Sequence, residues 1–180
     1  MVDRKWARKG FIQSEGFRKI AKAVYETLSD YDYALIGGLA VSCYANPPVT
    51  VDADFLVNAE TASLRDSLVG FEAMGWKVGL LRFTHRRRGF PEHGFQLKKG
   101  KLVLDLIATG EDEYLRSVVQ NGKLRYMGGE QIKVVSANDL VVIKSLVGRD
   151  KDIDDVAELS RSLGDKLDWD YINEKIGELE

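Results

Sequence analysis

The sequence predicts an α+β fold with a helical C-terminal part, and three observations support this prediction. Helix and strand patterns alternate over residues 17–75. Apolar strand patterns then follow one another, and Gly100 joins two of them as a hairpin. Helical patterns occupy residues 137–179. Strands and helices that are segregated along the chain in this way are typical of α+β domains.

The N-terminal half begins with an amphipathic helix, because apolar residues from Phe17 to Leu28 recur at intervals of three and four. The Gly37-Gly38 pair turns the chain from a short apolar strand into a second helix. That helix must end before Pro47, since proline lacks a backbone N–H and restricts the residue before it. The predicted elements are a helix at 17–30, a strand at 33–36, a helix at 38–45, a strand at 51–57 and a helix at 61–74.

The second half is predicted to contain mainly strands, followed by helices. We expect residues 1–135 to form a core that includes the N-terminal helix, and residues 136–180 to form a helical part packed on that core. The predicted elements are strands at 76–82, 95–99 and 101–107, a helix at 111–120, strands at 123–127 and 131–135, and helices at 137–147, 150–163 and 171–179.

Composition indicates one compact protein outside the membrane. The chain has 180 residues, 44% of them hydrophobic, which is enough for a real core. The single cysteine, Cys43, excludes an intramolecular disulfide and suits a reducing compartment. No apolar run follows the N-terminal charges, and the most apolar stretch, 33–45, is too short to span a bilayer. We therefore expect a cytoplasmic protein without a membrane partner.

Charge is unevenly distributed, although the formal net charge is only −2. Lysine and arginine dominate residues 1–22 and 82–101, whereas the last thirty residues are acidic. Such clustering allows an anionic partner to be steered towards one side of the protein, without identifying that partner.

Two aspartates lie two residues apart in an apolar strand, Val-Asp-Ala-Asp-Phe-Leu-Val. Asp52 and Asp54 therefore project from the same face. Carboxylates this close to each other and to a core repel and lose hydration, and a divalent cation such as Mg²⁺ would relieve that cost. Because Asp-x-Asp occurs five times in the chain, spacing alone decides nothing. Only the 52/54 pair lies in an apolar strand, and the other four lie in turns or on polar helical segments, where solvation or helix capping explains them.

A third aspartate, Asp105, lies in another hydrophobic strand, Leu-Val-Leu-Asp-Leu-Ile. If this strand lies beside the strand that carries Asp52 and Asp54, three carboxylates converge. Two metal ions held by such a cluster can stabilise the attacking and the leaving oxygen of a displacement at phosphorus. The alternative is an aspartate at a strand end that pairs with an arginine.

Together these segments resemble the polymerase-beta nucleotidyltransferase superfamily. Its pattern of a strand running into a glycine pair, an Asp-x-Asp strand and a later aspartate is similar to Ile36-Gly37-Gly38, Asp52-Ala53-Asp54 and Asp105. Segments 136–144 and 148–155 are similar to the C-terminal helical pattern of bacterial members, which include minimal nucleotidyltransferases, abortive-infection toxins and antibiotic-modifying enzymes. The resemblance covers about residues 33–160. It implies a mixed sheet flanked by helices, and two-Mg²⁺ transfer of a nucleoside monophosphate from a nucleoside triphosphate.

The resemblance also implies roles for individual residues. Asp52, Asp54 and Asp105 would be the catalytic, metal-holding residues, and Asp105 could help to remove the acceptor's proton. Gly37-Gly38 would let phosphate approach the backbone; the alternative is a plain turn. The predicted nucleotide-binding residues are Gly37, Gly38, Thr50 and Lys144.

Lys144 has an alternative interpretation, a solvated lysine on an amphipathic helix. A structural network of ion pairs, in which each exposed pair contributes about 0–1 kcal/mol, better explains the charged residues that follow it: Arg149, Asp150, Lys151, Asp152 and Asp155. Arg86, Arg87 and Arg88 are the predicted acceptor-binding residues, because consecutive arginines can pair with phosphates. A charged hairpin tip is the alternative.

One departure from the family pattern supports a second hypothesis. Many bacterial relatives have an arginine just before the Thr-x-Asp-x-Asp run, and this chain has Pro47-Pro48-Val49 before Thr50. The alternative function is therefore an inactive nucleotide- or RNA-binding module of the same fold. A third hypothesis is the toxin of a toxin–antitoxin system, held inactive by an antitoxin protein. The acceptor stays open between RNA (including a tRNA end), a protein side chain and a small-molecule hydroxyl.

Overall fold

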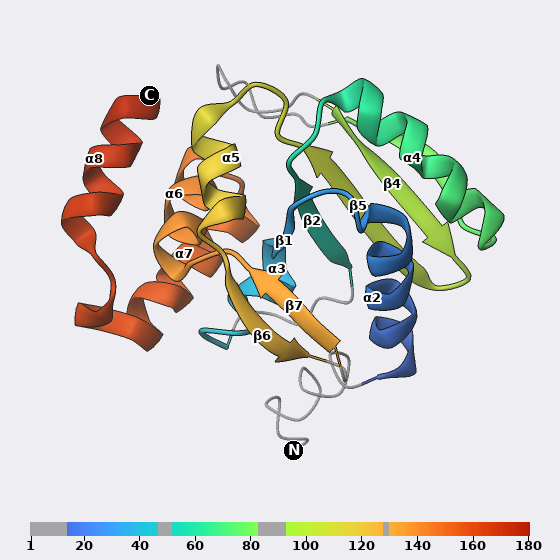
Figure 1. Cartoon of the computed structure of the whole chain (residues 1–180). Coiled ribbons are helices and arrows are strands. Elements are labelled where there is room, and N and C mark those ends of the chain that lie inside the picture. Colours follow the sequence, from blue (N-terminus) through green and yellow to red (C-terminus); the bar gives the residue numbers. More distant parts are fainter. Residues whose placement is uncertain (1–13, 47–51, 83–92, 128–129) are drawn as a thin grey trace.

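A mixed seven-stranded sheet with helices packed on it forms the centre of the molecule (Figure 1). The computed structural model describes residues 14–46, 52–82, 93–127 and 130–180. The strands are β1 (Tyr33–Ile36), β2 (Ala53–Val57), β3 (Lys77–Arg82), β4 (His93–Lys99), β5 (Leu102–Ala108), β6 (Lys123–Met127) and β7 (Glu130–Val134). The helices are α2 (Glu15–Leu28), α3 (Gly37–Val41), α4 (Thr61–Ala73), α5 (Glu113–Gln120), α6 (Ala137–Val147), α7 (Asp150–Leu163) and α8 (Trp169–Leu179), with a 3₁₀ turn at Gly164–Lys166.

The sheet order is β3-β4-β5-β2-β1-β7-β6. The pairs β2–β5 and β1–β7 are parallel, and the other neighbouring strands are antiparallel. The α+β fold, the mixed sheet and the flanking helices predicted from the sequence are therefore confirmed. This order places β5 directly beside β2, so the two aspartate-bearing strands are neighbours.

Alternation along the central strands separates an apolar face from a polar one. Leu104 and Leu106 of β5 are completely buried, whereas Asp105 between them is half-buried. In β2, Phe55 is buried and Asp54 is half-buried in the same way. Each large apolar side chain buried here contributes about 1.5–3 kcal/mol. The core therefore fixes which face the aspartates occupy.

Helices α2 and α4 lie side by side over the apolar face (Figure 1). The apolar residues of α2 that recur at helical spacing, such as Phe17 and Ile20, are buried, as predicted. The helix begins two residues earlier than expected, because the Ser14 hydroxyl accepts a hydrogen bond from the backbone N–H of Phe17 (3.2 Å) and caps it.

The second predicted helix is shorter than expected. It was predicted at 38–45, but α3 ends at Val41 and a series of turns follows. The Ser42 hydroxyl donates to the carbonyl of Leu39 (2.6 Å), and the N–H of Cys43 bonds to the carbonyl of Ala40 (3.0 Å). Serine competes in this way for the helical carbonyls, so the chain leaves the helix before the prolines require it.

A buried carboxylate joins the C-terminal helices to the core. Asp139 of α6 is 5% exposed and accepts hydrogen bonds from the hydroxyls of Tyr114 (3.1 Å), Tyr171 (2.6 Å) and Ser136 (2.6 Å). These partners come from α5, α8 and the N-cap of α6, so one side chain ties three helices together. The division between 1–135 and 136–180 remains a prediction, and one continuous hydrophobic core crosses it. Among the described helices, none has the length and apolar character needed to cross a bilayer.

Candidate active site

A row of residues in register crosses the polar face of the sheet. Ile36 of β1 pairs with Asp54 of β2, Asp54 pairs with Asp105 of β5, and Asp105 pairs with Gln96 of β4. Side chains of directly paired residues project from the same face. The structure therefore places the carboxylates of Asp54 and Asp105 on the same face of adjacent strands.

The lack of a side chain at Gly37 leaves room for the carboxylate of Asp54. A Cβ atom at Gly37 would lie 2.0 Å from Oδ2 of Asp54, and the φ angle of +70° is one that side-chain-bearing residues rarely adopt. Gly37 begins α3 directly after β1. The glycine turn and the strand that carries Asp52 and Asp54 are separate in the sequence, and they are in contact at Gly37 and Asp54.

The local environment disfavours the ionised carboxylates. Burial, followed by the nearby charges of Asp105 and Asp52, raises the pKa of Asp54 to about 7. Burial also raises the pKa of Asp105, with a further contribution from Asp52. Gln96 acts in the opposite direction, because its Nε2 donates a hydrogen bond to Oδ1 of Asp105 (3.1 Å). Repulsion between these carboxylates would be relieved by a proton or by a cation.

Asp52 lies at the entry to β2 and is exposed. Its charge acts on both Asp54 and Asp105, so the three carboxylates share one region. Within the ranges that the structure describes, however, no three His, Cys, Asp or Glu side chains come close enough together to hold a metal ion. Asp54 and Asp105 are half-buried neighbours on adjacent strands, whereas Asp52 is exposed. As hard oxygen donors they have the chemistry that Mg²⁺ prefers.

Lysine and arginine side chains from α6 and α7 act on the β2 side of this carboxylate row. The charges of Lys151 and Lys144 both lower the pKa of Asp54, against the larger effect of burial. Asp54 in turn contributes to the raised pKa of Arg149. Lys151 is exposed in the first turn of α7. Lys144, Arg149 and Lys151 therefore act on Asp54 from the side of α6 and α7.

Lys144 itself is neither solvated nor free. It is 5% exposed, and its Nζ lies 3.0 Å from Oδ1 of Asp152 and 2.7 Å from Oδ2 of Asp155. Arg149 adds a bond from Nε to Oδ2 of Asp152 (2.6 Å). The solvated-lysine alternative is therefore wrong, because the lysine is needed to neutralise two buried carboxylates.

The predicted ion-pair network is present in part, because Arg149, Asp152 and Asp155 form ion pairs, whereas Asp150 and Lys151 form none with the residues that the structure describes. Its energetics also differ from the expectation. Asp152 and Asp155 are buried rather than exposed. Removing one partner of a buried pair leaves an uncompensated charge and costs about 3–5 kcal/mol, well above the 0–1 kcal/mol of an exposed pair. This network joins α6 to α7.

Sequence reasoning missed Gln96. Glutamine in a strand of mixed polarity carries no distinguishing pattern, and only the β4–β5 register shows that it faces Asp105. Thr50, Arg86, Arg87 and Arg88 lie outside the described residues.

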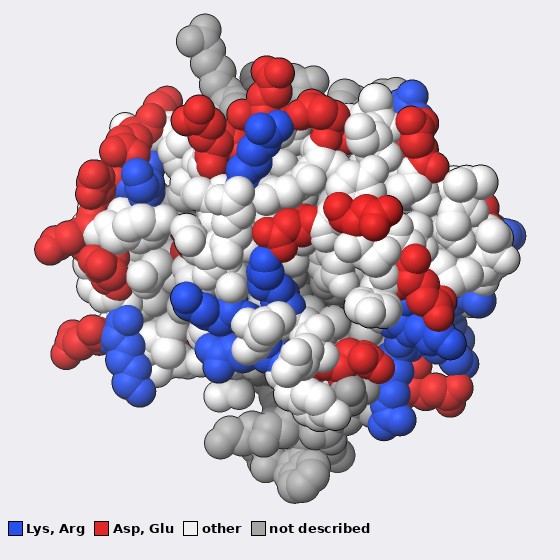
Figure 2. Space-filling model, in the orientation of Figure 1, with Lys and Arg blue, Asp and Glu red and all other residues white. Residues whose placement is uncertain are grey.

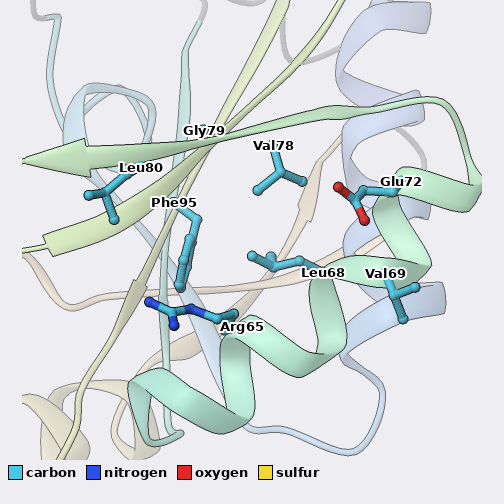
Figure 3. Close-up of a pocket in the computed structure, with 8 residues that line it drawn as sticks. All are labelled: Arg65, Leu68, Val69, Glu72, Val78, Gly79, Leu80 and Phe95. Carbon is cyan, nitrogen blue, oxygen red and sulfur yellow. The ribbon is translucent and has the colours of Figure 1, made fainter.

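A separate hollow lies on the other face of the sheet, between α4 and the strands β3 and β4 (Figure 3). Its volume is about 450 Å³. Phe95 lines it, whereas its neighbour Gln96 points towards Asp105, so the hollow and the carboxylates are on opposite faces. The lining residues are Arg65, Leu68, Val69, Glu72, Val78, Gly79, Leu80 and Phe95.

Surface charge is also segregated. In Figure 2, acidic side chains gather over α8 at the left of the view, and basic side chains gather in the lower centre over β6 and β7. Lys123 and Arg125 of β6 are exposed, and the Arg125 guanidinium lies 5.3 Å from the ring centroid of Tyr44. The acidic C-terminal region noted in the sequence thus forms a face of its own.

A mixed sheet with neighbouring aspartates on β2 and β5, beside a glycine turn, is the arrangement that the resemblance to nucleotidyltransferases predicted. Residues 16–179 match the family described as "Nucleotidyltransferase of unknown function (DUF6036)", and the chain belongs to this family. The resemblance stated from the sequence is confirmed.

Solved structures show the same fold at low sequence identity. ANT(2″)-Ia in complex with adenylyl-2″-tobramycin has a TM-score of 0.55 and 16% identity, with 91% of this chain and 94% of that chain covered. The lincomycin-bound lincosamide antibiotic adenylyltransferase LnuA has a TM-score of 0.54 and 14% identity, with 82% and 96% covered. An antigenic nucleotidyltransferase-like protein from Paracoccidioides brasiliensis has a TM-score of 0.52 and 16% identity, with 83% and 77% covered. No curated protein matches the sequence.

Proposed function

We propose that this protein transfers a nucleoside monophosphate from a nucleoside triphosphate to a hydroxyl group of an acceptor. The observation that supports this most directly is the in-register pair of Asp54 and Asp105, with Gly37 held against Asp54. In the reaction, the acceptor's hydroxyl oxygen bonds to the α-phosphorus, and the bond from the α-phosphorus to the oxygen that bridges it to the β-phosphate breaks. Pyrophosphate leaves, and the hydroxyl proton is released.

We assign the removal of that proton to Asp105. Burial raises its pKa, which brings a carboxylate closer to the range in which a general base works. Gln96 donates its hydrogen bond to Oδ1, so Oδ2 would be the oxygen that contacts the reacting groups. Asp105 would therefore orient the acceptor and accept its proton.

Asp52, Asp54 and Asp105 would hold the two Mg²⁺ ions implied by the resemblance. Burial, together with the charges of Asp105 and Asp52, raises the pKa of Asp54 to about 7 and supports a cation at this place, because a positive charge offsets the lost hydration and the repulsion between carboxylates. When bound, such ions supply charge neutralisation for the attacking and leaving oxygens.

The triphosphate would lie between the Gly37-Gly38 turn and α7. We assign its charge neutralisation to Lys151, which is exposed and acts on Asp54, rather than to Lys144 directly. Lys144 is occupied by Asp152 and Asp155, so it would support the nucleotide site by holding α7 in place. Thr50 stays a predicted nucleotide-binding residue.

The inactive binding module remains the second candidate. It is favoured by one observation, that the described carboxylates do not form a ready-made three-ligand metal cluster. Isothermal titration with each nucleoside triphosphate distinguishes the two candidates, since binding without Mg²⁺-dependent turnover supports the module. A toxin role would be supported by growth arrest on expression that a neighbouring antitoxin relieves, and harmless overexpression would count against it.

The experiment that tests the enzyme incubates the protein with each α-labelled nucleoside triphosphate, Mg²⁺ and total cell extract. We expect label to enter RNA, protein or small molecules with the wild type and not with Asp54→Asn. Asp30→Asn is the matched control, because Asp30 belongs to another Asp-x-Asp and is exposed at the end of α2. Equal labelling by the wild type and by Asp54→Asn would refute the proposal.

A further inference from the structure

Two lysines stand directly opposite each other on neighbouring strands. Lys77 of β3 pairs in register with Lys98 of β4, and both side chains are exposed. Like charges in directly opposed positions destabilise a sheet. Neither lysine has an ion pair with any other residue that the structure describes. The pair therefore concentrates two positive charges at one place.

These lysines share the face of the sheet that carries the carboxylates. Lys98 and Gln96 lie two residues apart in β4, so they project from the same side, about 6.7 Å apart along the strand. Gln96 is bonded to Asp105, and the charge of Lys98 lowers the pKa of Asp105 against the larger effect of burial. The next residue, Lys99, points the other way and donates to the carbonyl of Met74 (2.5 Å).

Protection of a sheet edge does not explain both residues. Lysines on edge strands discourage unwanted strand pairing, and β3 is an edge strand, which accounts for Lys77. Strand β4 lies inside the sheet between β3 and β5, so Lys98 has no such role. An anion bound across the two side chains would remove their repulsion.

The position of Lys77 and Lys98 indicates which of the two substrates would supply the bound anion. The row of carboxylates runs from Asp54 on β2 to Asp105 on β5, and the glycine turn and α7 border its β2 end. Under the proposed function, the triphosphate occupies that end. Lys98 and Lys77 lie beyond Asp105 at the other end, where the acceptor hydroxyl would approach.

Resting on that proposed function, we propose that Lys77 and Lys98 bind a backbone phosphate of a single-stranded RNA acceptor, whose terminal hydroxyl then lies at Asp105. Lysine contacts to phosphate position a nucleic acid without reading its sequence. A polycationic acceptor such as an aminoglycoside would be repelled by the same pair. A protein acceptor offers no regular phosphate beside its hydroxyl, so the lysine pair favours RNA.

Binding tests this inference without requiring catalysis. Fluorescence anisotropy with a labelled single-stranded RNA oligonucleotide would compare the wild type with the Lys77→Gln/Lys98→Gln double variant over a range of salt concentrations. We expect the double variant to bind about tenfold more weakly. The slope of log K against log salt concentration should be smaller by about 0.7, since each neutralised phosphate of a single strand contributes about 0.7 to that slope. Lys123→Gln, an exposed lysine on the opposite edge strand, should retain wild-type affinity. Equal affinity of the double variant and the wild type would overturn the inference.

Transfer assays then separate the two proposals. With wild-type protein we expect an RNA with a free 3′-hydroxyl to accept label in preference to tobramycin, and the double variant to raise KM for RNA about tenfold while KM for the nucleotide is unchanged. Preferred labelling of tobramycin or of protein would overturn the RNA assignment and leave the nucleotidyltransferase intact. Loss of RNA affinity in the double variant, with no transfer by the wild type to any acceptor, would instead remove the proposed enzyme and keep the RNA contact.

Discussion

Gly37 and Asp54 lie so close together that a single added carbon at Gly37 would be 2.0 Å from Oδ2 of Asp54. The glycine turn and the first carboxylate are thus parts of one structural unit. Any side chain at Gly37 must displace the carboxylate that pairs with Asp105.

The first prediction follows from this contact. Gly37→Ala should abolish nucleotidyl transfer and destabilise the fold, because it combines a backbone penalty of about 1–2 kcal/mol with displacement of Asp54. Gly110→Ala is the matched control, since Gly110 also has a positive φ (+56°) but a Cβ atom there would have no neighbour within 4 Å. Chemical denaturation and label transfer would be measured for both. Full activity in Gly37→Ala would contradict the predicted role of the turn.

The second prediction concerns the loss of folding stability that the half-buried Asp54 carboxylate causes. The pKa of Asp54 in the folded protein, about 7, is above its ordinary value of 3.8. The protonated group therefore contributes stability at low pH that is lost as the pH rises from about 4 to about 7. Asp54→Asn should increase the free energy of unfolding of the metal-free protein, by about 1–3 kcal/mol at pH 8 and by less at pH 5, since one pKa unit corresponds to about 1.4 kcal/mol.

Urea denaturation in the presence of a chelator would measure this effect at both pH values. Asp30→Asn, at an exposed aspartate, should show no such gain. A destabilised Asp54→Asn protein at pH 8 would show that the carboxylate is a structural partner rather than a functional group held at a cost.

The third prediction concerns the buried network between α6 and α7. Asp152→Asn should lower the free energy of unfolding by about 3 kcal/mol, because it weakens the neutralisation of buried Lys144. Burial opposes ionisation of Asp152, but bonds from Arg149 and Lys144 hold its pKa below the ordinary value. Its contribution is therefore present above about pH 4 and is lost as the pH falls further.

Thermal or urea unfolding between pH 3 and pH 7 would test that dependence. The exposed pair Lys19–Glu15 provides the comparison, and Glu15→Gln should leave the unfolding transition close to that of the wild type, because exposed ion pairs contribute little. A similar loss in both variants would contradict the distinction between buried and exposed pairs.

The fourth prediction concerns Gln96, which acts through Asp105. Gln96→Leu removes the hydrogen bond to Oδ1 and should lower kcat about 10–100-fold without unfolding the protein, as is usual for residues that orient a metal-holding carboxylate. Mn²⁺ binding followed by electron paramagnetic resonance should weaken in parallel. Gln96→Asn, a shorter amide, should restore part of the activity. Unchanged Mn²⁺ affinity in Gln96→Leu would argue for a purely structural role.

Much of the fold could be predicted because the hydrophobic periodicity of each segment matches the side chains that the core buries. The strand predicted at 33–36 and the helix predicted at 137–147 match β1 and α6 residue for residue. The earlier starts of α2 and α8 arise from caps. The start of α8 at Trp169 rather than at residue 171 follows from Asp168, whose carboxylate accepts from the N–H of Tyr171 (3.0 Å). Such caps depend on side-chain rotamers, which hydrophobic periodicity does not predict.

The candidate site could be predicted only in part. Asp54 and Asp105 stand out as charges in apolar strands, and the β2–β5 pairing then brings them together. Gln96 and the opposed lysines become visible only through the β3–β4–β5 register, which no local pattern determines. The burial of Lys144 likewise depends on how α7 packs on α6.

The most direct test of the central claim is a comparison of labels in a single turnover. Wild-type protein, Mg²⁺ and the accepted nucleoside triphosphate would be followed once with label at the α-phosphate and once at the γ-phosphate. Nucleotidyl transfer at the carboxylate row predicts that α-label moves to the acceptor and γ-label leaves as pyrophosphate. Asp54→Asn and Asp105→Asn should each lose this transfer at least a hundredfold, and Asp30→Asn should not. Transfer of γ-label to the acceptor, or wild-type rates in both site variants, would contradict the claim.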